Sequence, residues 1–285
     1  MHIERSGESI VECTKDLPNT EQYHYLVVKH NDLIQKARVS LTAAQQKFIS
    51  YAITLIKPDD EEFQFYEIRV EDFCNIMGKN KDWFYKEFKN LIDDLDDDKL
   101  WIETDEKIIK FRWFSEVEYL KGKGAVRVMF NSNLKRYLLS QTERFTQYEL
   151  INIVALKSKY SHSLFELLKS YAFRGNVRIT IENLKFTLGL NDDSTKKSSY
   201  DNFSNLRARI LEPAKKEINA YTELIIDYTP IMKGRKVTEI EFSVKKKSTQ
   251  GQYCSYLNTM NKVKEHVDGQ MIMSFEDFEA IKHRK

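Results

Sequence analysis

The stretch IRVEDFCNIMG at residues 68–78 returns almost unchanged as ITIENLKFTLG at residues 179–189. Each copy opens with the apolar alternation of a short strand and then changes to the apolar spacing of a helix. Each ends in glycine, Gly78 or Gly189, at the position after a helix where a left-handed backbone is common. We therefore predict the same strand and helix in both places.

The similarity continues on both sides of the two phrases, as a duplicated domain requires. Upstream, KFISYAI at residues 47–53 corresponds to LLKSYAF at residues 167–173. Downstream, both copies have an apolar helical stripe with the same spacing, made by Tyr85, Phe88, Leu91 and Leu95 in the first copy and by Tyr200, Phe203, Leu206 and Ile210 in the second. The basic turn KGKG at residues 121–124 corresponds to KGRK at residues 233–236. This persistence indicates an internal repeat.

Each copy has the element order of a winged-helix domain, which is a variant of the helix-turn-helix. The order is a long helix, a short strand, a helix, a second amphipathic helix and two strands around a basic glycine turn. In the first copy we expect these elements at residues 41–56, 63–70, 71–78, 81–95, 101–120 and 125–130. In the second copy we expect them at residues 149–172, 177–180, 181–189, 199–218, 225–232 and 237–244. The predicted fold class is α+β, with two tandem winged-helix domains related by internal duplication.

The repeat also divides the chain into segments. We expect a flexible leader at residues 1–22, a first winged-helix domain at residues 23–143 and a second at residues 144–247. A tail at residues 248–285 contains MIMSFEDFEAIKHRK, which is compatible with a short helix, and the sequence assigns it no role.

The sequence lacks the patterns that are typical of several classes of protein. No apolar run approaches the ~20 residues that cross a bilayer, and residues 1–22 are polar, so we expect a cytoplasmic protein without a membrane partner. Cys13, Cys74 and Cys254 have no metal-ligand spacing. The histidines never stand two apart, as a rolling-circle nicking enzyme would need, and no GxxxxGK[ST] loop exists. We therefore expect no catalytic residue, no metal and no cofactor.

The formal net charge of +2 does not by itself indicate a binding partner, but the charged residues are distributed differently in the two copies. Residues 79–99 of the first copy carry five lysines against seven acidic residues, and DDLDDD at 93–98 is expected to be a solubilising helix end. Residues 196–217 of the second copy carry six basic residues against three acidic ones. The second copy is therefore expected to hold the main sequence-specific DNA-binding helix.

Helical spacing predicts which side chains of that helix face DNA. The outward set is Asp201, Ser204, Asn205 and Ala208, with Arg207 and Arg209 on the flanks. Asparagine suits the edge of adenine and arginine that of guanine. Phosphate contacts are predicted before the helix, at Lys196, Lys197 and Ser198, and at the hairpin tips, at Lys233, Arg235 and Lys236 in the second copy and at Lys121 and Lys123 in the first.

Simpler interpretations of these residues remain open. Arg207 and Arg209 could solvate an exposed helix or pair with Glu212, and KGKG could be a solvated turn. The lysines at residues 245–247 are expected to be a solvated strand end rather than a binding site.

Two stretches carry a family resemblance. VVKHNDLIQKARVSLTAAQQKFISYAI at residues 27–53 and YDNFSNLRARILEPAKKEINAYTELIIDY at residues 200–228 resemble the iteron-binding replication initiators of theta-replicating plasmids. The second stretch is the more specific, because a generic winged helix would lack the pairing of Pro213 with EIN at residues 217–219. The resemblance covers roughly residues 25–247.

The resemblance implies a function and partners. It implies binding of double-stranded direct repeats at a plasmid origin as a monomer, opening of a neighbouring A+T-rich segment, and recruitment of the host initiator and replicative helicase. It also implies a dimer, formed through the first domain, that represses its own promoter. Because family members also contact DNA with the first domain, KGKG and Arg127 remain candidates. The alternatives are a tandem winged-helix transcriptional repressor without an origin-opening role and a protein-interaction module.

Overall fold

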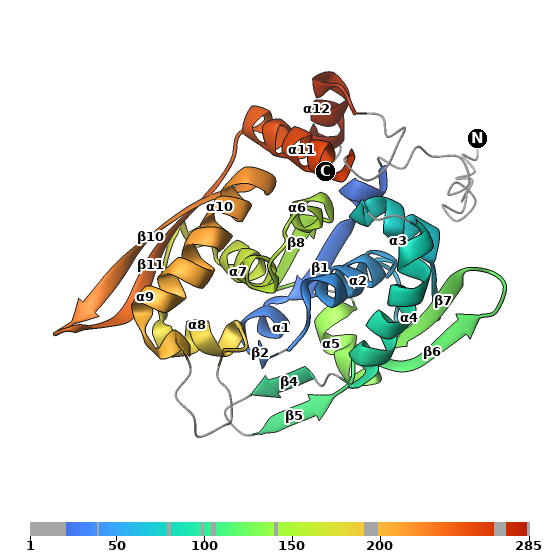
Figure 1. The fold of residues 1–285 in the computed structure, drawn as a ribbon, viewed down its shortest axis with the longest axis horizontal. Coiled ribbons are helices and arrows are strands. Elements are labelled where there is room, and N and C mark those ends of the chain that lie inside the picture. Colours follow the sequence, from blue (N-terminus) through green and yellow to red (C-terminus); the bar gives the residue numbers. More distant parts are fainter. Residues whose placement is uncertain are drawn as a thin grey trace, which may run out of the picture.

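Two winged-helix lobes lie at the two ends of a central layer (Figure 1). This layer contains α1 (Asn31–Gln35), α7 (Lys159–Ser170), β1 (Leu26–His30) and β8 (Phe145–Glu149). The computed structural model describes residues 21–38, 40–78, 81–97, 100–103, 107–139, 142–190, 199–264 and 272–283. The C-terminal helices α11 and α12 run across the top of this arrangement in Figure 1.

The first lobe contains the predicted elements in the predicted order. They are α2 (Ala43–Thr54), β3 (Tyr66–Arg69), α3 (Val70–Met77), α4 (Lys81–Asp97), β6 (Phe114–Leu120) and β7 (Ala125–Phe130). Thr42 and Gln45 form a capping box at the start of α2, which satisfies N–H groups that the helix leaves unpaired. Gly78 ends α3 with φ 60°, the left-handed conformation expected there.

The second lobe repeats this plan. Its elements are β9 (Asn176–Thr180), α8 (Ile181–Thr187), α9 (Phe203–Leu206), α10 (Glu212–Tyr221), β10 (Leu224–Lys233) and β11 (Lys236–Lys246). Gly189 follows α8 with φ 65°, as Gly78 follows α3. The sheets have corresponding strand orders, β3-β7-β6 and β9-β11-β10. The predicted duplication and the two winged-helix domains are confirmed.

Residues 101–120, expected to contribute one strand, contain three. Strands β4 (Leu100–Glu103) and β5 (Ile108–Phe111) form a hairpin that joins β2 (Ala37–Arg38) in a separate sheet, and only then does β6 begin. Lys110 lies 3.8 Å from the centre of the Trp101 ring, a cation–π contact across this hairpin. The expected single strand was therefore wrong in this segment.

The helix expected at residues 149–172 is also divided. Strand β8 (Phe145–Glu149) leads into the short α6 (Ile151–Val154), and α7 (Lys159–Ser170) begins after a break. Ser158 caps α7 through its hydroxyl, which accepts from the N–H of Tyr160 at 3.2 Å. Glu217 of α10 accepts the N–H groups of Lys157 and Ser158, so the break is held by the second lobe.

The two lobes share one continuous hydrophobic core. Strand β1 (Leu26–His30), from the start of the first lobe, pairs with β8, which leads into the second lobe. The Nζ of Lys29 on β1 lies 2.6 Å from Oε1 of Glu166 on α7, and both side chains are largely buried. Two further short helices, α1 (Asn31–Gln35) and α5 (Lys135–Leu138), pack on β1. The predicted division at residues 143 and 144 therefore lies beside a paired strand.

The tail, which has no role predicted from its sequence, contains two helices that contact both lobes. Tyr256 and Met260 of α11 (Thr249–Lys264) and Phe278 of α12 (Phe275–His283) are buried. A side chain on Gly78, at the end of α3, would come within 3.1 Å of Val263 on α11. Toward the second lobe, the side-chain Nδ2 of Asn258 on α11 donates to the carbonyl of Ala220 on α10.

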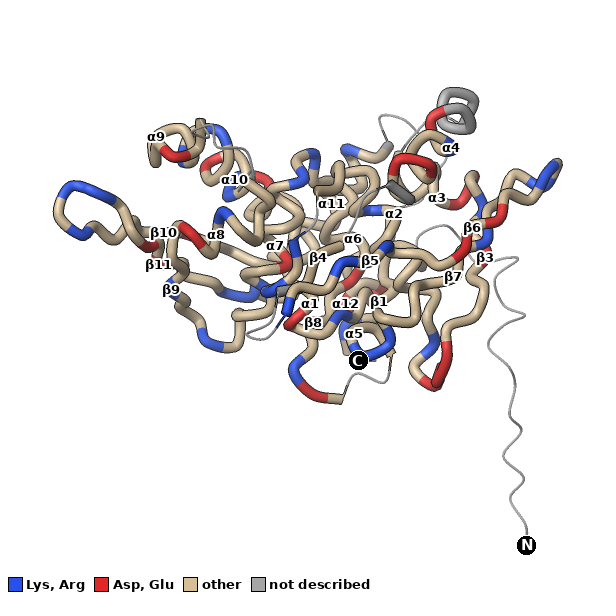
Figure 2. The backbone as a smooth tube through the Cα atoms, turned by 90° about the horizontal axis from the view of Figure 1, so that it is seen from below, with Lys and Arg blue, Asp and Glu red and all other residues tan. Residues whose placement is uncertain are grey.

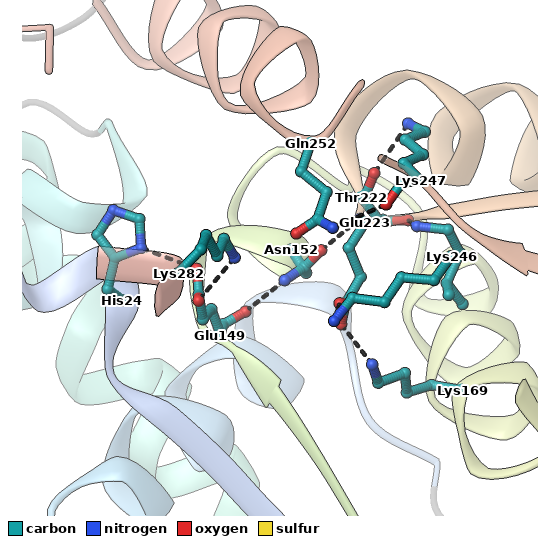
Figure 3. Close-up of polar contacts among 11 residues, drawn as sticks. His24, Glu149, Asn152, Lys169, Thr222, Glu223, Lys246, Lys247, Gln252 and Lys282 are labelled. Atoms are coloured by element: carbon teal, nitrogen blue, oxygen red, sulfur yellow. Dashed lines mark hydrogen bonds and ion pairs between the residues drawn. The ribbon is translucent and has the colours of Figure 1, made fainter. Parts of the chain in front are cut away.

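Lys247 differs from the solvated strand end that the sequence suggests. Its Nζ donates to the carbonyl of Thr222, at the end of α10, at 2.8 Å (Figure 3). It also donates to the carbonyl of Asn219 at 2.6 Å and to the hydroxyl of Ser255 on α11 at 2.7 Å. Burial lowers its pKa to about 8. A positive charge at the C-terminal end of a helix is stabilising. Because Lys247 contacts both the end of α10 and Ser255 on α11, it connects the tail to the second lobe.

Candidate nucleic-acid interface

The helix predicted at residues 199–218 is a composite. A short turn at Ser199–Asp201 precedes α9, a π-helical turn occupies Arg207–Leu211, and α10 follows. Asn202 caps α9 through a 2.9 Å bond to the N–H of Ser204. The π turn ends at Leu211, one residue short of Glu212 and Pro213, and a proline has no N–H and would clash with a carbonyl in a regular α-helical turn. The wider turn removes that conflict and keeps the helix continuous. Together α9, the π turn and α10 form the recognition segment, residues 203–221.

The recognition segment has the two faces that its spacing predicts. Leu206 and Ile210 are 0% and 1% exposed. Tyr200 and Phe203 are partly buried against the same core. The opposite face exposes Ser204, Arg207, Ala208, Arg209, Glu212, Pro213 and Lys216.

Asn205 differs from its predicted outward position. It is half-buried, and its Nδ2 donates to the carbonyl of Ser199 at 2.9 Å. Asn205 therefore holds the turn before α9, which leaves its amide oxygen and the second N–H of Nδ2 available to a base. Its DNA contact stays a prediction.

The two arginines of the segment have different surroundings. The Nε of Arg207 lies 3.3 Å from Oε1 of Glu212, the pairing that the sequence left open. Arg209 is exposed and makes no ion pair or hydrogen bond with any described residue. Of the two, Arg209 has its whole guanidinium available to a base, whereas Arg207 shares its Nε with Glu212.

Sequence reasoning missed two exposed residues on this face, Pro213 and Lys216. Lys216 lies seven residues after Arg209, a spacing that returns to the same face of a helix and could have indicated it. The ring of Pro213 adds an apolar surface of the kind that contacts the methyl group of thymine.

The EIN residues that carry the family resemblance have structural roles here. Ile218 is fully buried. The Asn219 side chain pairs with the backbone of Ile226 on β10, accepting at 2.7 Å and donating at 3.0 Å. Together with the bonds from Glu217 to the start of α7, these contacts fix the recognition segment against the sheet.

The hairpin of β10 and β11 ends in the predicted basic tip. Gly234, with φ 63°, occupies the first central position of a two-residue turn, where a positive φ matches the twist of the strands. Lys233 and Lys236 are directly opposite each other in the register, and Arg235 lies between them in the turn. All three are exposed, and none has an ion-pair partner among the described residues. Opposed like charges are unfavourable, and a phosphate between them would remove the repulsion.

Three of the predicted contacts, Lys196, Lys197 and Ser198, lie outside the described residues. Lys185 on α8 forms a 2.7 Å ion pair with Asp201, just before α9. This pair engages the one acidic residue that was predicted to face DNA at the start of the recognition segment.

The first lobe has a weaker basic surface. Lys121 and Lys123 are exposed at the tip of the β6–β7 hairpin, where Gly122 has φ 75°. A groove of about 700 Å³ separates this tip from α4, and Tyr119 in the groove donates to Asp93 of α4 at 2.8 Å. Arg127 forms an ion pair with Glu118 on the neighbouring strand. The side chains of Asp96, Asp97 and Asp98 lie outside the described part.

Helix α4 of the first lobe and the recognition segment of the second lie along the same edge of the molecule, and the two hairpin tips project at its opposite ends (Figure 2). Each tip carries basic residues in that view. Among the residues that the structure describes, no group of three or more His, Cys, Asp or Glu side chains could hold a metal ion. No helix in the described ranges is both long and apolar enough to span a membrane.

Two family models match the chain in the order of the lobes. The model described as "Initiator Replication protein, WH1" matches residues 26–169, and the one described as "Initiator Rep protein, WH2" matches residues 180–244. The tail that contains α11 and α12 lies beyond both matches.

Similar proteins include two bacterial relatives and a solved structure. The chain is 24% identical to an "Uncharacterized 27.6 kDa protein" of Escherichia coli over 63% of its own length and 77% of that protein. It is 28% identical to a "Probable replication protein rep" of Bifidobacterium longum over 44% of its own length and 40% of that protein, less than half of that relative. The fold is similar to that in the crystal structure of Pi initiator protein in complex with iteron DNA, with a TM-score of 0.66, 20% identity, and coverage of 79% of this chain and 99% of that one.

Proposed function

Because the chain belongs to the family of initiator replication proteins with WH1 and WH2 domains, we propose that it is a plasmid replication initiator that binds directly repeated DNA elements at an origin. The observation that carries this proposal is the exposed surface formed by Arg209 and Lys216 of the recognition segment and the basic tip of the β10–β11 hairpin. The Pi initiator protein, which has a similar fold, was crystallised with iteron DNA.

In this proposal the second domain, residues 144–247, reads the sequence. The recognition segment enters the major groove, where Ser204, Asn205 and Arg209 face the base edges. Lys233, Arg235 and Lys236 contact the phosphates beside it. Lys196, Lys197 and Ser198 precede the recognition segment in the chain and serve as further phosphate contacts.

The first domain, residues 23–143, has an auxiliary role in this proposal. Lys121 and Lys123 contact the phosphate backbone beyond the repeat. Asp93 and Asp94 on the exposed side of α4 suit a protein surface better than a phosphate, which supports host-protein docking or dimerisation on this lobe. Origin opening, recruitment of the host initiator and replicative helicase, and repression of its own promoter by the dimer belong to the same proposal.

The test is a footprint of the purified chain on the DNA that flanks its own gene, with the oligomeric state followed by light scattering. Monomers that occupy successive direct repeats, with thymines nearby becoming reactive to permanganate, would support an initiator that opens its origin. A dimer that protects a single inverted repeat without permanganate reactivity would leave a tandem winged-helix repressor and remove the replication role.

A further inference from the structure

Glu212 is an acidic residue in the middle of the proposed DNA-facing surface. Its neighbours on the exposed face of the recognition segment are Arg209, Pro213 and Lys216. A carboxylate repels the phosphates that this surface would approach. Its presence there is explained by the two groups that it contacts.

The carboxylate joins the recognition segment to the hairpin. Its Oε1 accepts from the hydroxyl of Tyr228 on β10 at 2.6 Å and from the Nε of Arg207 at 3.3 Å. The Tyr228 hydroxyl is the largest cause that lowers the pKa of Glu212, and Arg207 adds to it. Glu212 is therefore an ionised acceptor at neutral pH.

The π turn is what brings Arg207 and Glu212 together. Five residues advance an α-helix by about 500°, which would leave their side chains about 140° apart around the axis. The turn at Arg207–Leu211 is π-helical and has a wider circuit, so residues five apart come to the same side. This turn precedes Pro213, which links the position of Arg207 to the local sequence.

Tyr228 gives the carboxylate a fixed anchor. Its ring lies 5.9 Å from that of Phe242, a fully buried residue on β11. The Nζ of Lys215 lies 5.8 Å from the centre of the Tyr228 ring and forms an ion pair with Asp227 at 2.6 Å. The Tyr228 ring is thus placed by β10, by its packing on Phe242 and by Lys215 of α10.

The contact with Glu212 occupies only the Nε edge of the Arg207 guanidinium. Arg207 meets Glu212 through Nε, and its side chain is 60% exposed. An Nε contact leaves the two terminal Nη groups available, and these match the paired acceptors O6 and N7 of guanine. A fixed guanidinium loses less side-chain freedom when it binds a base.

We propose that Glu212 is a positioning residue which, together with Tyr228, orients Arg207 for a two-point contact with guanine in the bound repeat. This inference rests on the proposed function. It assigns Glu212 a role through Arg207 and not a contact with the DNA itself.

The test selects binding sites for the full-length chain from a library of random-sequence duplexes. Arg207→Ala should lose the preference for a G·C pair at one position of the selected sequence. Glu212→Gln and Tyr228→Phe should each reduce the preference at that same position by roughly three- to tenfold. Combining Glu212→Gln with Arg207→Ala should cause no further loss, because both changes remove one interaction.

A second exposed pair provides the matched control. The Nε of Arg178 lies 2.8 Å from Oε1 of Glu241 on the same sheet, away from the recognition segment, so Glu241→Gln should leave every base preference unchanged. Unchanged preferences in Glu212→Gln and Tyr228→Phe, or a change at a different position from Arg207→Ala, would overturn the positioning role alone. A wild-type chain that selects no sequence would overturn the proposed function as well. Thermal unfolding of each variant separates these outcomes from misfolding.

Discussion

The Nζ of Lys282, near the C-terminus, lies 2.7 Å from Oε1 of Glu149, which stands at the end of β8 and is only 6% exposed. The other oxygen of the same carboxylate lies 2.8 Å from Nδ1 of His24 (Figure 3). One buried carboxylate therefore joins the start of the first lobe, the junction of the lobes and the last helix. Helix α12 lies beyond both family matches, so this contact involves a segment that neither family model covers.

We expect Lys282→Met to lower the free energy of unfolding by about 1–3 kcal/mol, because a buried carboxylate loses a charged partner. Urea unfolding of the full chain measures this. Lys245→Met is the control, since Lys245 is exposed and has no ion pair within the described part of the chain. Its effect should stay within about 0.5 kcal/mol. Equal effects of the two changes would contradict a fastening role for α12.

Gly78→Ala should destabilise the chain more than Gly122→Ala. Both glycines have a positive φ, which costs an alanine about 1–2 kcal/mol. At Gly78 the new Cβ would also lie 3.1 Å from Val263, whereas nothing stands within 4 Å at Gly122. Thermal unfolding should show an additional loss of about 1 kcal/mol or more at Gly78. Similar losses at both positions would mean that α11 does not pack against the end of α3.

Glu166→Gln should lower the free energy of unfolding by about 3–5 kcal/mol, because it leaves Lys29 as a buried charge without its carboxylate. Tyr148 also donates to this carboxylate. Replacing both partners, with Lys29→Met and Glu166→Leu, should recover part of the loss. Urea unfolding of the single and double variants gives the comparison, and a double variant worse than Glu166→Gln would contradict it.

Glu166 should also make the free energy of unfolding depend on pH. Burial alone would raise the pKa of Glu166, but Lys29 and His162 outweigh burial and hold the pKa well below its ordinary value. A folded-state pKa below the unfolded value of 4.5 gives stabilisation that is complete above that pH and is lost as the pH falls. The stability gap between wild type and Glu166→Gln should therefore be constant near neutral pH and shrink in acid. A gap that widens in acid would contradict this assignment.

Arg209→Ala should relax base preference at one position of the binding site, with a cost of about 1–3 kcal/mol for the preferred sequence. The reason is that Arg209 is exposed on the recognition segment without a protein partner among the described residues. Fluorescence anisotropy with the preferred duplex and its single-base variants measures the effect. An equal loss on every sequence would reassign Arg209 to a phosphate.

Arg235→Ala and Lys236→Ala should weaken binding to all sequences alike. Each should also reduce the slope of log affinity against log salt by about 0.9 per lost phosphate contact. A salt titration of the two variants checks both statements. A change in base preference with an unaltered salt slope would place the hairpin tip in a groove instead.

The sequence predicted the winged-helix lobes because their signals are local. The helical spacing around Leu206 and the glycines at positions 78 and 189 are readable within one element. The pairing of β1 with β8 joins residues more than a hundred positions apart, which no local pattern reports. The β4–β5 hairpin has no glycine or proline between its strands, so the usual turn signal is missing.

The candidate site was predictable where exposure follows helical spacing and was not where one side chain contacts another. Arg209 and the hairpin tip lie as their patterns indicate. The π turn could have been suspected from Pro213 inside a helical pattern, but the contact of Glu212 with Tyr228 depends on the sheet. Lys247 looked solvated because its burial depends on α11, in a tail that the repeat does not cover.

The proposed function requires that this chain recognises directly repeated DNA through its second winged-helix domain. The most direct measurement mixes the purified chain with short fragments of the whole replicon that carries its gene, at physiological salt, and sequences the bound fraction. Enrichment of one fragment with an array of short direct repeats, abolished when Arg209→Ala and Arg235→Ala are combined, is the predicted result. Recovery of fragments in proportion to their length alone, unchanged in that double variant, would contradict the account.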